Sequence, residues 1–339
     1  MEKGRRAFIF PQVDGLVSEL KELNNYLKKR KQVQGSYEAR RREARQKGLF
    51  FPLRRLGRDE IEDFFRGFPL VGVDGSLNTV GASFPYTVTF FRALARSSRV
   101  GAGGEQIWVY QIFSPLLPEH RAKVEEKLKL RLDPEEAVAR LRWETLAALE
   151  AEVGKRALEK EHPRLLLWDG GFARLETHAP SIWNDVKSRA LGEGVVMLGI
   201  TEEIATSVLG GALPVPGEYG VGELAADREI LYGLLRPGEG FQRKKEDREK
   251  VGRVYVRLAR HPQVIAVDYF PEQSEDLLPA LNFLYTITPE HGRGFPFWLD
   301  LVDAEVRITR EQVEVLLANY LDPALAEVYF RPLRARRDL

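Results

Sequence analysis

The order of apolar and polar residues predicts a helical beginning followed by strands and helices. Residues 12–47 are predicted to be helical because their apolar positions follow helical spacing: Val13, Leu16, Leu20, Leu23 and Leu27. The apolar run at 70–73 predicts a buried strand with Asp74 at its tip, followed by a turn at Gly75 and Ser76. Strands at 86–98 and 105–113 flank a glycine-rich link and predict a hairpin.

A long helix is predicted at 134–160, because Asp133 can cap it and Pro134 suits its first turn. The sequence RLLLWDGG then predicts a second buried strand that ends in an acid, Asp169. A helix at 178–192 and a strand at 194–201 continue a parallel βαβ pattern.

The remaining pattern predicts a surface excursion, two strands and two helices. Residues 207–250 are rich in Gly and Pro and then in charge, which indicates a long surface segment. Strands are expected at 253–259 and 263–270, and a helix at 274–288. Residues 290–309 are predicted to be a loop and a strand, and 311–321 a final helix.

The predicted order is one strand, a hairpin of two further strands, a helix, and a strand parallel to the first. This order is the topology of the ribonuclease H fold. We therefore predict an α/β chain with a ribonuclease H-like mixed central sheet, a helical N-terminal extension and C-terminal insertions. The expected boundaries are a basic helical extension at 1–65, a nuclease-like domain at 66–320 and a tail at 321–339.

The amino-acid composition excludes several kinds of site and of protein. Among 339 residues there is no cysteine, which excludes disulfides, thiolate metal sites and cysteine nucleophiles. No apolar run approaches the roughly 18 residues of a membrane span, so we expect a soluble cytoplasmic protein without a membrane partner. Many charges and only two methionines fit a thermophile.

Charge is nearly balanced overall but unevenly distributed. The 51 Lys and Arg and the 50 Asp and Glu leave a formal charge of +1, yet residues 28–58 carry twelve basic and two acidic side chains. This segment is either a solvated helical face or an arm that contacts DNA phosphates. The second interpretation selects Arg40, Arg41 and Arg42, with three rings that could stack on bases: Tyr37, Phe50 and Phe51.

Three acids stand out by position. Asp74 and Asp169 end neighbouring strands, where open α/β sheets place ligand sites. Glu144 is chosen among the glutamates of the connecting helix because its neighbours are apolar: Leu141, Trp143, Leu146 and Ala147. Converging carboxylates repel one another unless a cation neutralises them, so the pattern predicts Mn²⁺ or Mg²⁺. Two ions about 3.5–4 Å apart would suit phosphodiester hydrolysis.

These motifs resemble the NurA nuclease family over residues 70–310. The segments that carry the resemblance are GVDGS, LRWETLAALEAE, LLLWDGGFARL and GFPFWLDLVDAEVRIT. The resemblance implies a ribonuclease H-like fold and Mn²⁺ held by Asp74, Glu144 and Asp169. It also implies 5′-to-3′ exonuclease and single-strand endonuclease activity, and homodimers that work with the hexameric HerA ATPase on DNA ends in repair and recombination.

The chain departs from this family at three points. Phe295 stands where the family usually has tyrosine. The family has a histidine about eight residues after that tyrosine, and this chain has Asp303 there, with Asp300 as the competing candidate. Aspartate also binds hard metals, so Asp303 would complete a four-acid site. Glu202 and Glu203 follow LGIT, where the family often has a basic residue that contacts DNA. Ser76 is expected to touch a phosphate or bond locally, and Phe295 to contact DNA.

Other chemistries fit less well. The five histidines are scattered without ligand spacing, the serines lack the context of a nucleophile elbow, and no P-loop motif occurs. Two alternatives stay open: an actin- or sugar-kinase-like ATPase, which shares this type of sheet, and a degenerate nuclease that only tethers the motor.

Overall fold

The computed structural model describes residues 14–33, 36–99, 106–209, 226–244 and 250–331. A sheet of nine strands forms the centre, in the order β1-β7-β8-β9-β6-β5-β2-β3-β4. The strands are β1 Gly48–Pro52, β2 Leu70–Val80, β3 Val88–Ser97, β4 Gln106–Phe113, β5 Leu165–Asp169, β6 Val196–Thr201, β7 Glu239–Arg243, β8 Gly252–Arg257 and β9 Ile265–Tyr269.

The predicted ribonuclease H-like core is confirmed. Strands β2, β3 and β4 form an antiparallel meander, and β5 returns parallel to β2 after the long helix α5, Pro134–Glu161. Strand β6 continues the parallel part, whereas β9 is antiparallel to β6. The expected helix start is present, because Asp133 accepts hydrogen bonds from the amides of Glu135 and Glu136.

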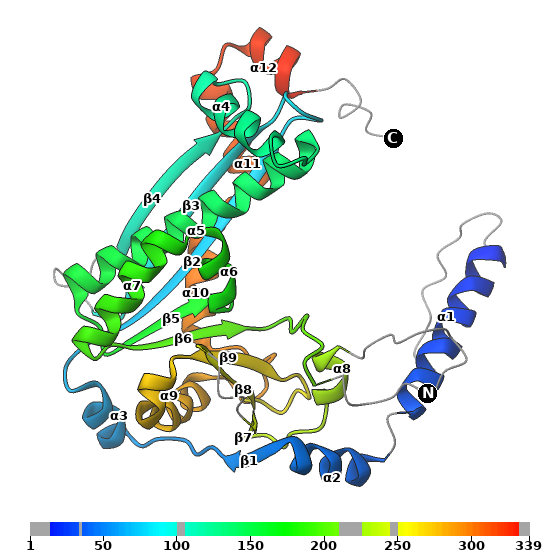
Figure 1. Cartoon of the computed structure of the whole chain (residues 1–339), viewed down its shortest axis with the longest axis vertical. Helices are drawn as coiled ribbons and strands as arrows, with labels where there is room; N and C mark the ends of the chain where they lie inside the picture. Colours follow the sequence, from blue (N-terminus) through cyan, green and yellow to red (C-terminus); the bar gives the residue numbers. More distant parts are fainter. Residues whose placement is uncertain (1–13, 34–35, 100–105, 210–225, 245–249, 332–339) are drawn as a thin grey trace.

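Helices cover both faces of the sheet (Figure 1). One face packs against α5, α6 (Phe172–His178) and α7 (Pro180–Glu193), with α4 (Pro118–Leu128) further along α5. The other face packs against α3 (Arg58–Phe65), α9 (Ser274–Ile287) and α10 (Phe297–Val306). Apolar side chains from strands and helices meet between these layers, so the sheet is buried on both sides over its central strands.

Strand β2 is longer than predicted, and Asp74 lies inside it rather than at its tip. Its parallel pairing with β5 stops at Val73 and Trp168, but its antiparallel pairing with β3 runs on to Val80. The second half of β2 therefore belongs to a ribbon that extends beyond the parallel sheet (Figure 1). Helices α11 (Arg310–Tyr320) and α12 (Pro323–Phe330) lie near the far end of this ribbon.

Two further predictions from the pattern are wrong. Residues 297–306 form helix α10 instead of a loop and strand; Leu299, Val302 and Val306 are buried at helical spacing. Within the predicted excursion at 207–250, residues 227–231 form α8 (Asp227–Leu231) and 239–243 form β7, although 210–225 and 245–249 lie outside the described residues. Strand β1, which falls in the expected extension at 1–65, pairs with β7.

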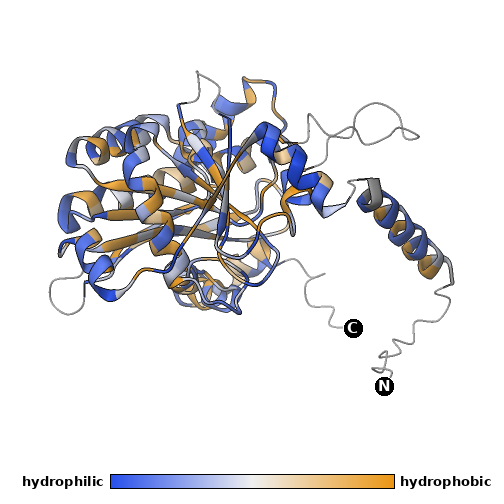
Figure 2. Ribbon diagram, turned by 90° about the horizontal axis from the view of Figure 1, so that it is seen from below, coloured by the Kyte–Doolittle hydropathy of each residue, from blue (hydrophilic) through white to orange (hydrophobic). Residues whose placement is uncertain are grey.

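The N-terminal side forms two helices, α1 (Asp14–Val33) and α2 (Tyr37–Lys47), as the periodicity predicts. Helix α1 lies apart from the sheet (Figures 1 and 2). Its leucines are each more than half exposed: Leu16, Leu20, Leu23 and Leu27. No helix of the described residues has the length and apolar character to cross a membrane.

Candidate active site

Asp74 and Asp169 are brought together by the register of β2 and β5. The last paired residues are Val73 and Trp168, so the next residue of each strand is one of the two acids. Asp74 is only 8 % exposed, and its Oδ1 accepts a hydrogen bond from the amide of Gly75 at 2.7 Å. Because β5 ends at Asp169, side chains from both faces of the sheet can reach this point.

Glu150 enters the cluster from helix α5, which approaches β2 closely at Gly75. A Cβ atom at Gly75 would lie 2.6 Å from Oε1 of Glu150 and 2.8 Å from Cδ1 of Leu146. A larger residue at Gly75 would therefore force Glu150 or Leu146 to shift, so glycine lets the helix bring Glu150 beside Asp74. The Glu150 side chain is 2 % exposed.

Asp303 enters from helix α10, which approaches the other face of β2 at Gly72. A Cβ atom at Gly72 would lie 2.9 Å from Trp298 Cδ1 and from Val302 Cγ2. The next residue, Asp303, acts electrostatically on both Asp74 and Asp169. Its Oδ2 also pairs with Arg307 at 2.5 Å. Asp300 pairs with Arg293 and is not among the main charges that raise the pKa of these two acids, so Asp303 is the better supported of the two candidates.

Burial and mutual repulsion perturb the acids. The pKa of Asp74 is raised well above its usual range, first by burial and then by Asp169 and Glu150. The pKa of Asp169 is raised to about 7 by burial and by the charges of Glu150 and Asp303. Ionised carboxylates at this site therefore need a compensating positive charge at neutral pH.

The donor set fits a hard divalent cation. Asp74, Asp169 and Asp303 supply carboxylate oxygens from three elements, and no sulfur or imidazole is part of the cluster. Within the described ranges, no three His, Asp or Glu side chains are already arranged as a metal site. A cation would therefore have to draw these carboxylates inward.

Arg174 of α6 is the basic side chain that contacts the cluster. Its guanidinium pairs with both oxygens of Glu150, one of them at 3.0 Å, and donates to the carbonyl of Asp169 at 3.3 Å. The local chain supports this position, because Gly170 adopts φ +96° and the amide of Phe172 donates to Asp268 at 3.0 Å. Neither Arg174 nor Glu150 is selected by sequence reasoning.

Glu144 lies outside the cluster. Its Oε1 pairs with Lys127 of α4 at 2.7 Å and with Arg140 at 3.2 Å. Glu150 is six residues further along α5, and six residues at about 100° each place the two glutamates on different sides of the helix. The apolar neighbours of Glu144 do not indicate which side of α5 faces β2. That side is indicated by Gly75 of β2 and by the small residues of α5, Ala147, Ala151 and Gly154.

Ser76 and Phe295 have structural contacts. The hydroxyl of Ser76 accepts a hydrogen bond from the amide of Ile308 at 3.0 Å, which joins β2 to the chain after α10. Phe295 is 2 % exposed and packs in the apolar layer beneath the sheet, so its side chain does not lie on the surface as a contact with DNA requires.

The three arginines at 40–42 differ in environment. Arg41 is buried and pairs through two bonds with Glu239, at 2.6 and 2.8 Å, while its guanidinium lies 4.0 Å from the ring centre of Phe50. Arg40 is half-buried and donates to the carbonyls of Ile230 and Tyr232. Arg42 is exposed. Phe50 and Phe51 pack against apolar clusters, so these two rings are not free to stack on bases.

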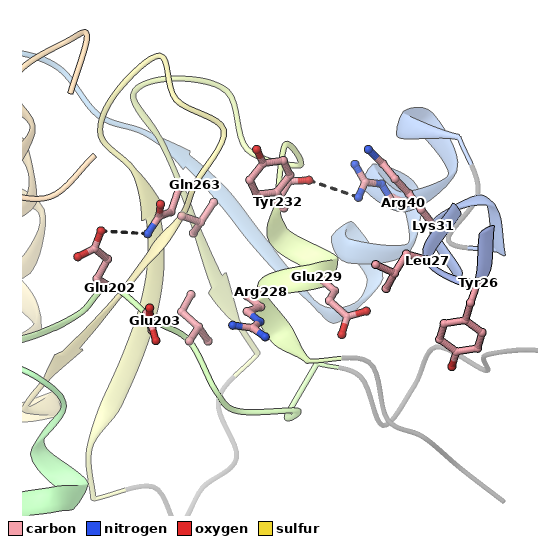
Figure 3. A pocket seen from close by; sticks show the side chains of 12 residues that line it. Tyr26, Leu27, Lys31, Arg40, Glu202, Glu203, Arg228, Glu229, Tyr232 and Gln263 are labelled. Carbon is pink, nitrogen blue, oxygen red and sulfur yellow. Dashed lines mark hydrogen bonds between the residues drawn. The ribbon is translucent and has the colours of Figure 1, made fainter. Parts of the chain in front are cut away.

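A cavity of about 660 Å³ adjoins the end of β6 (Figure 3). It is lined by side chains of α1, α2, α8 and the segments after β6 and β8, among them Lys31, Arg40, Glu202, Arg228 and Tyr232. Oε1 of Glu202 accepts a hydrogen bond from Gln263 at 3.3 Å. Its Oε2 pairs with Arg293 at 3.0 Å, so Arg293 neutralises the acid that stands at the expected basic position.

We expect Gly75→Ala to displace Glu150 and to lower the free energy of unfolding by about 1–3 kcal/mol, because the added methyl group overpacks the contact between α5 and β2. Chemical denaturation measures this effect. Gly192→Ala is the matched control, since nothing lies within 4 Å of a Cβ atom there. Equal stability of the two variants would contradict the close approach.

Comparisons with known proteins give a family and a fold for this chain. Residues 68–308 match the NurA domain. A crystal structure of NurA bound to dAMP and manganese superimposes with a TM-score of 0.51 at 10% identity, covering 95% of this chain and 100% of that chain. The catalytic domain of human endonuclease V gives a TM-score of 0.39 at 15% identity, covering 83% and 96%. Comparison with curated proteins gives no match.

Proposed function

Because the chain belongs to the NurA domain family, we propose that it is a divalent-metal-dependent nuclease that hydrolyses DNA phosphodiesters. The observation that carries the proposal is the convergence of Asp74, Asp169 and Asp303 from β2, β5 and α10. The NurA of known structure binds manganese and dAMP, which supports Mn²⁺, with Mg²⁺ as the alternative.

Asp74 and Asp169 are proposed to hold a shared cation, while Asp303 binds a second ion or orients the attacking water. When bound, two such ions would activate that water and neutralise the leaving oxygen. Burial of Asp74 and Asp169 strengthens the charge interaction between them, because little water screens these two carboxylates. Glu144 is left out of this proposed site because of its pairing with Lys127.

The direction of digestion, the form of DNA and the partners are proposed from the family to which the chain belongs. We propose 5′-to-3′ exonuclease and single-strand endonuclease action on DNA ends in the cytoplasm, as a homodimer working with a HerA-type hexameric ATPase in repair and recombination. The exposed leucines of α1 support burial against a second copy of the chain. Exposed Arg42 and Arg45 of α2 are the proposed phosphate contacts of the basic segment.

The test is cleavage of end-labelled single- and double-stranded DNA by the purified protein with Mn²⁺, with and without the motor. We expect cleavage with Mn²⁺ and none with EDTA. Absence of cleavage in every combination would reject the nuclease proposal. ATP turnover by the chain alone would favour the kinase-like alternative.

Metal binding is expected to stabilise the protein more at pH 8 than at pH 5.5. Since the pKa of Asp169 rises from 3.8 to about 7 on folding, the folded protein binds more protons than the unfolded chain between these values. The stability of the metal-free protein therefore falls as pH rises through this window. Cations bind the deprotonated carboxylates and reverse the loss. Thermal unfolding with and without Mn²⁺ measures this, and an equal shift at both pH values would contradict it.

A further inference from the structure

Arg174 combines burial in the acid cluster with unused hydrogen-bonding capacity. Its side chain is 24% exposed, whereas that of its partner Glu150 is 2% exposed. The positive charge of Arg174 also interacts with Asp74 and Asp169. The guanidinium therefore lies next to both strand acids, on a side chain that is partly open to solvent.

A count of donors shows what remains available. A guanidinium has five N–H groups. Three of these are used within the described residues: one on Nη1 and one on Nη2 by Glu150, and a second on Nη2 by the carbonyl of Asp169. The Nε–H group and one N–H of Nη1 have no hydrogen-bond partner among those residues. These two donors lie on opposite edges of the guanidinium, so a single anion can accept a hydrogen bond from one of them.

The two oxygens of Glu150 are both engaged by Arg174. A planar guanidinium bound in this way is fixed in orientation as well as in position. Glu150 itself is held by the tight approach of α5 to β2 at Gly75. The ion pair of Glu150 on α5 and Arg174 on α6 therefore holds the guanidinium in a fixed place beside the strand acids.

We propose that Arg174, anchored by Glu150, binds the DNA phosphate at the scissile position through one of its free N–H groups. This inference rests on the proposed function and adds a substrate contact to it. Glu150 then acts as a positioning residue for Arg174, and the cation is held by the aspartates. Phosphate suits both a remaining N–H donor of a positively charged guanidinium and a site that otherwise gathers cations.

The test compares R174Q with the wild-type protein. Binding of a labelled single-stranded oligonucleotide is measured by anisotropy with Ca²⁺ in place of Mn²⁺, under conditions in which a gel shows no cleavage. We expect roughly 10- to 100-fold weaker binding, as for a lost hydrogen-bonded charge. We also expect the slope of log affinity against log salt to fall by about 0.7, the value of one single-strand contact. Unchanged affinity and slope would overturn the proposal.

R156Q is the matched control, because Arg156 pairs with Glu152 on the same helix at 2.7 Å, outside the cluster. We expect its binding and salt slope to equal those of wild type, and a loss equal to that of R174Q would overturn the assignment. If R174Q does not fold, R174K keeps the charge and loses the fork. We expect R174K to bind DNA a few-fold more weakly than wild type, and wild-type affinity would overturn the proposal.

A second experiment tests whether Glu150 binds the metal or anchors Arg174. It uses Glu150→Gln and measures Mn²⁺ binding directly by electron paramagnetic resonance. We expect E150Q to reproduce the DNA-binding loss of R174Q while both variants bind Mn²⁺ within about threefold of wild type. Loss of Mn²⁺ binding in E150Q would make Glu150 a ligand and overturn its assignment as an anchor. If the wild-type protein itself neither binds nor cleaves DNA, the proposed function fails; if it does both and R174Q is normal, only this inference fails.

Discussion

Replacing Asp74 by Asn is expected to abolish DNA cleavage, by about 1,000-fold or more, and at the same time to stabilise the metal-free protein. Cleavage is lost because Asn removes the charge that would bind the cation. Stability rises because ionised Asp74 is buried beside Asp169 and Glu150, which raises its pKa and makes its charge unfavourable at neutral pH. The amide keeps nearly the same shape.

Single-turnover cleavage and thermal unfolding in EDTA measure the two effects. Asp300→Asn is the matched control, since Asp300 lies on the same helix as Asp303 but pairs with Arg293. We expect its cleavage to stay within a few-fold of wild type. Wild-type cleavage by D74N would reject the proposed metal site, and a lower unfolding temperature would reject the repulsion within the cluster.

Arg41→Ala is expected to lower the free energy of unfolding by about 3–5 kcal/mol, because it leaves Glu239 unpaired in a largely buried position. The same change removes the cation that lies over Phe50 and a bond to the carbonyl of Leu234. Arg41 therefore attaches α2 to β7 and is not a surface contact for DNA.

Arg42→Ala is the comparison, because this neighbouring side chain is exposed. We expect R42A to change stability by less than about 0.5 kcal/mol. Its salt slope for DNA binding should fall by about 0.7–0.9. Chemical denaturation and anisotropy give both quantities. Normal stability of R41A would contradict the role of the ion pair, and an unchanged slope in R42A would make the segment a solvated face.

The core topology and the two strand acids could be predicted because their signals are local. Apolar runs that end in Asp-Gly identify β2 and β5, and parallel pairing then brings Asp74 and Asp169 together. The length of β2 was not predictable in this way. Its second half pairs with β3 alone, and this pairing overrides the turn preference of Gly75 and Ser76.

The rest of the site depends on contacts between distant parts of the chain. Glu150 and Glu144 have similar local sequence, and only the packing of α5 on Gly75 distinguishes them. Arg174 acquires its role when the turn after β5 directs α6 back over Asp169. At α10, the sequence analysis predicts a loop and a strand, although the spacing of Leu299, Val302 and Val306 is helical.

The division of β2 into two halves has a consequence for local unfolding. Residues 70–73 are hydrogen-bonded to strands on both sides, whereas residues 74–80 pair with β3 only. Opening the ribbon therefore costs less free energy than opening the sheet. The backbone amide hydrogens of the two halves can exchange with solvent as separate units. Asp74 lies at the boundary between them. Asp74, the proposed metal ligand, is thus attached to the rigid sheet on its N-terminal side and to the more readily opened ribbon on its C-terminal side.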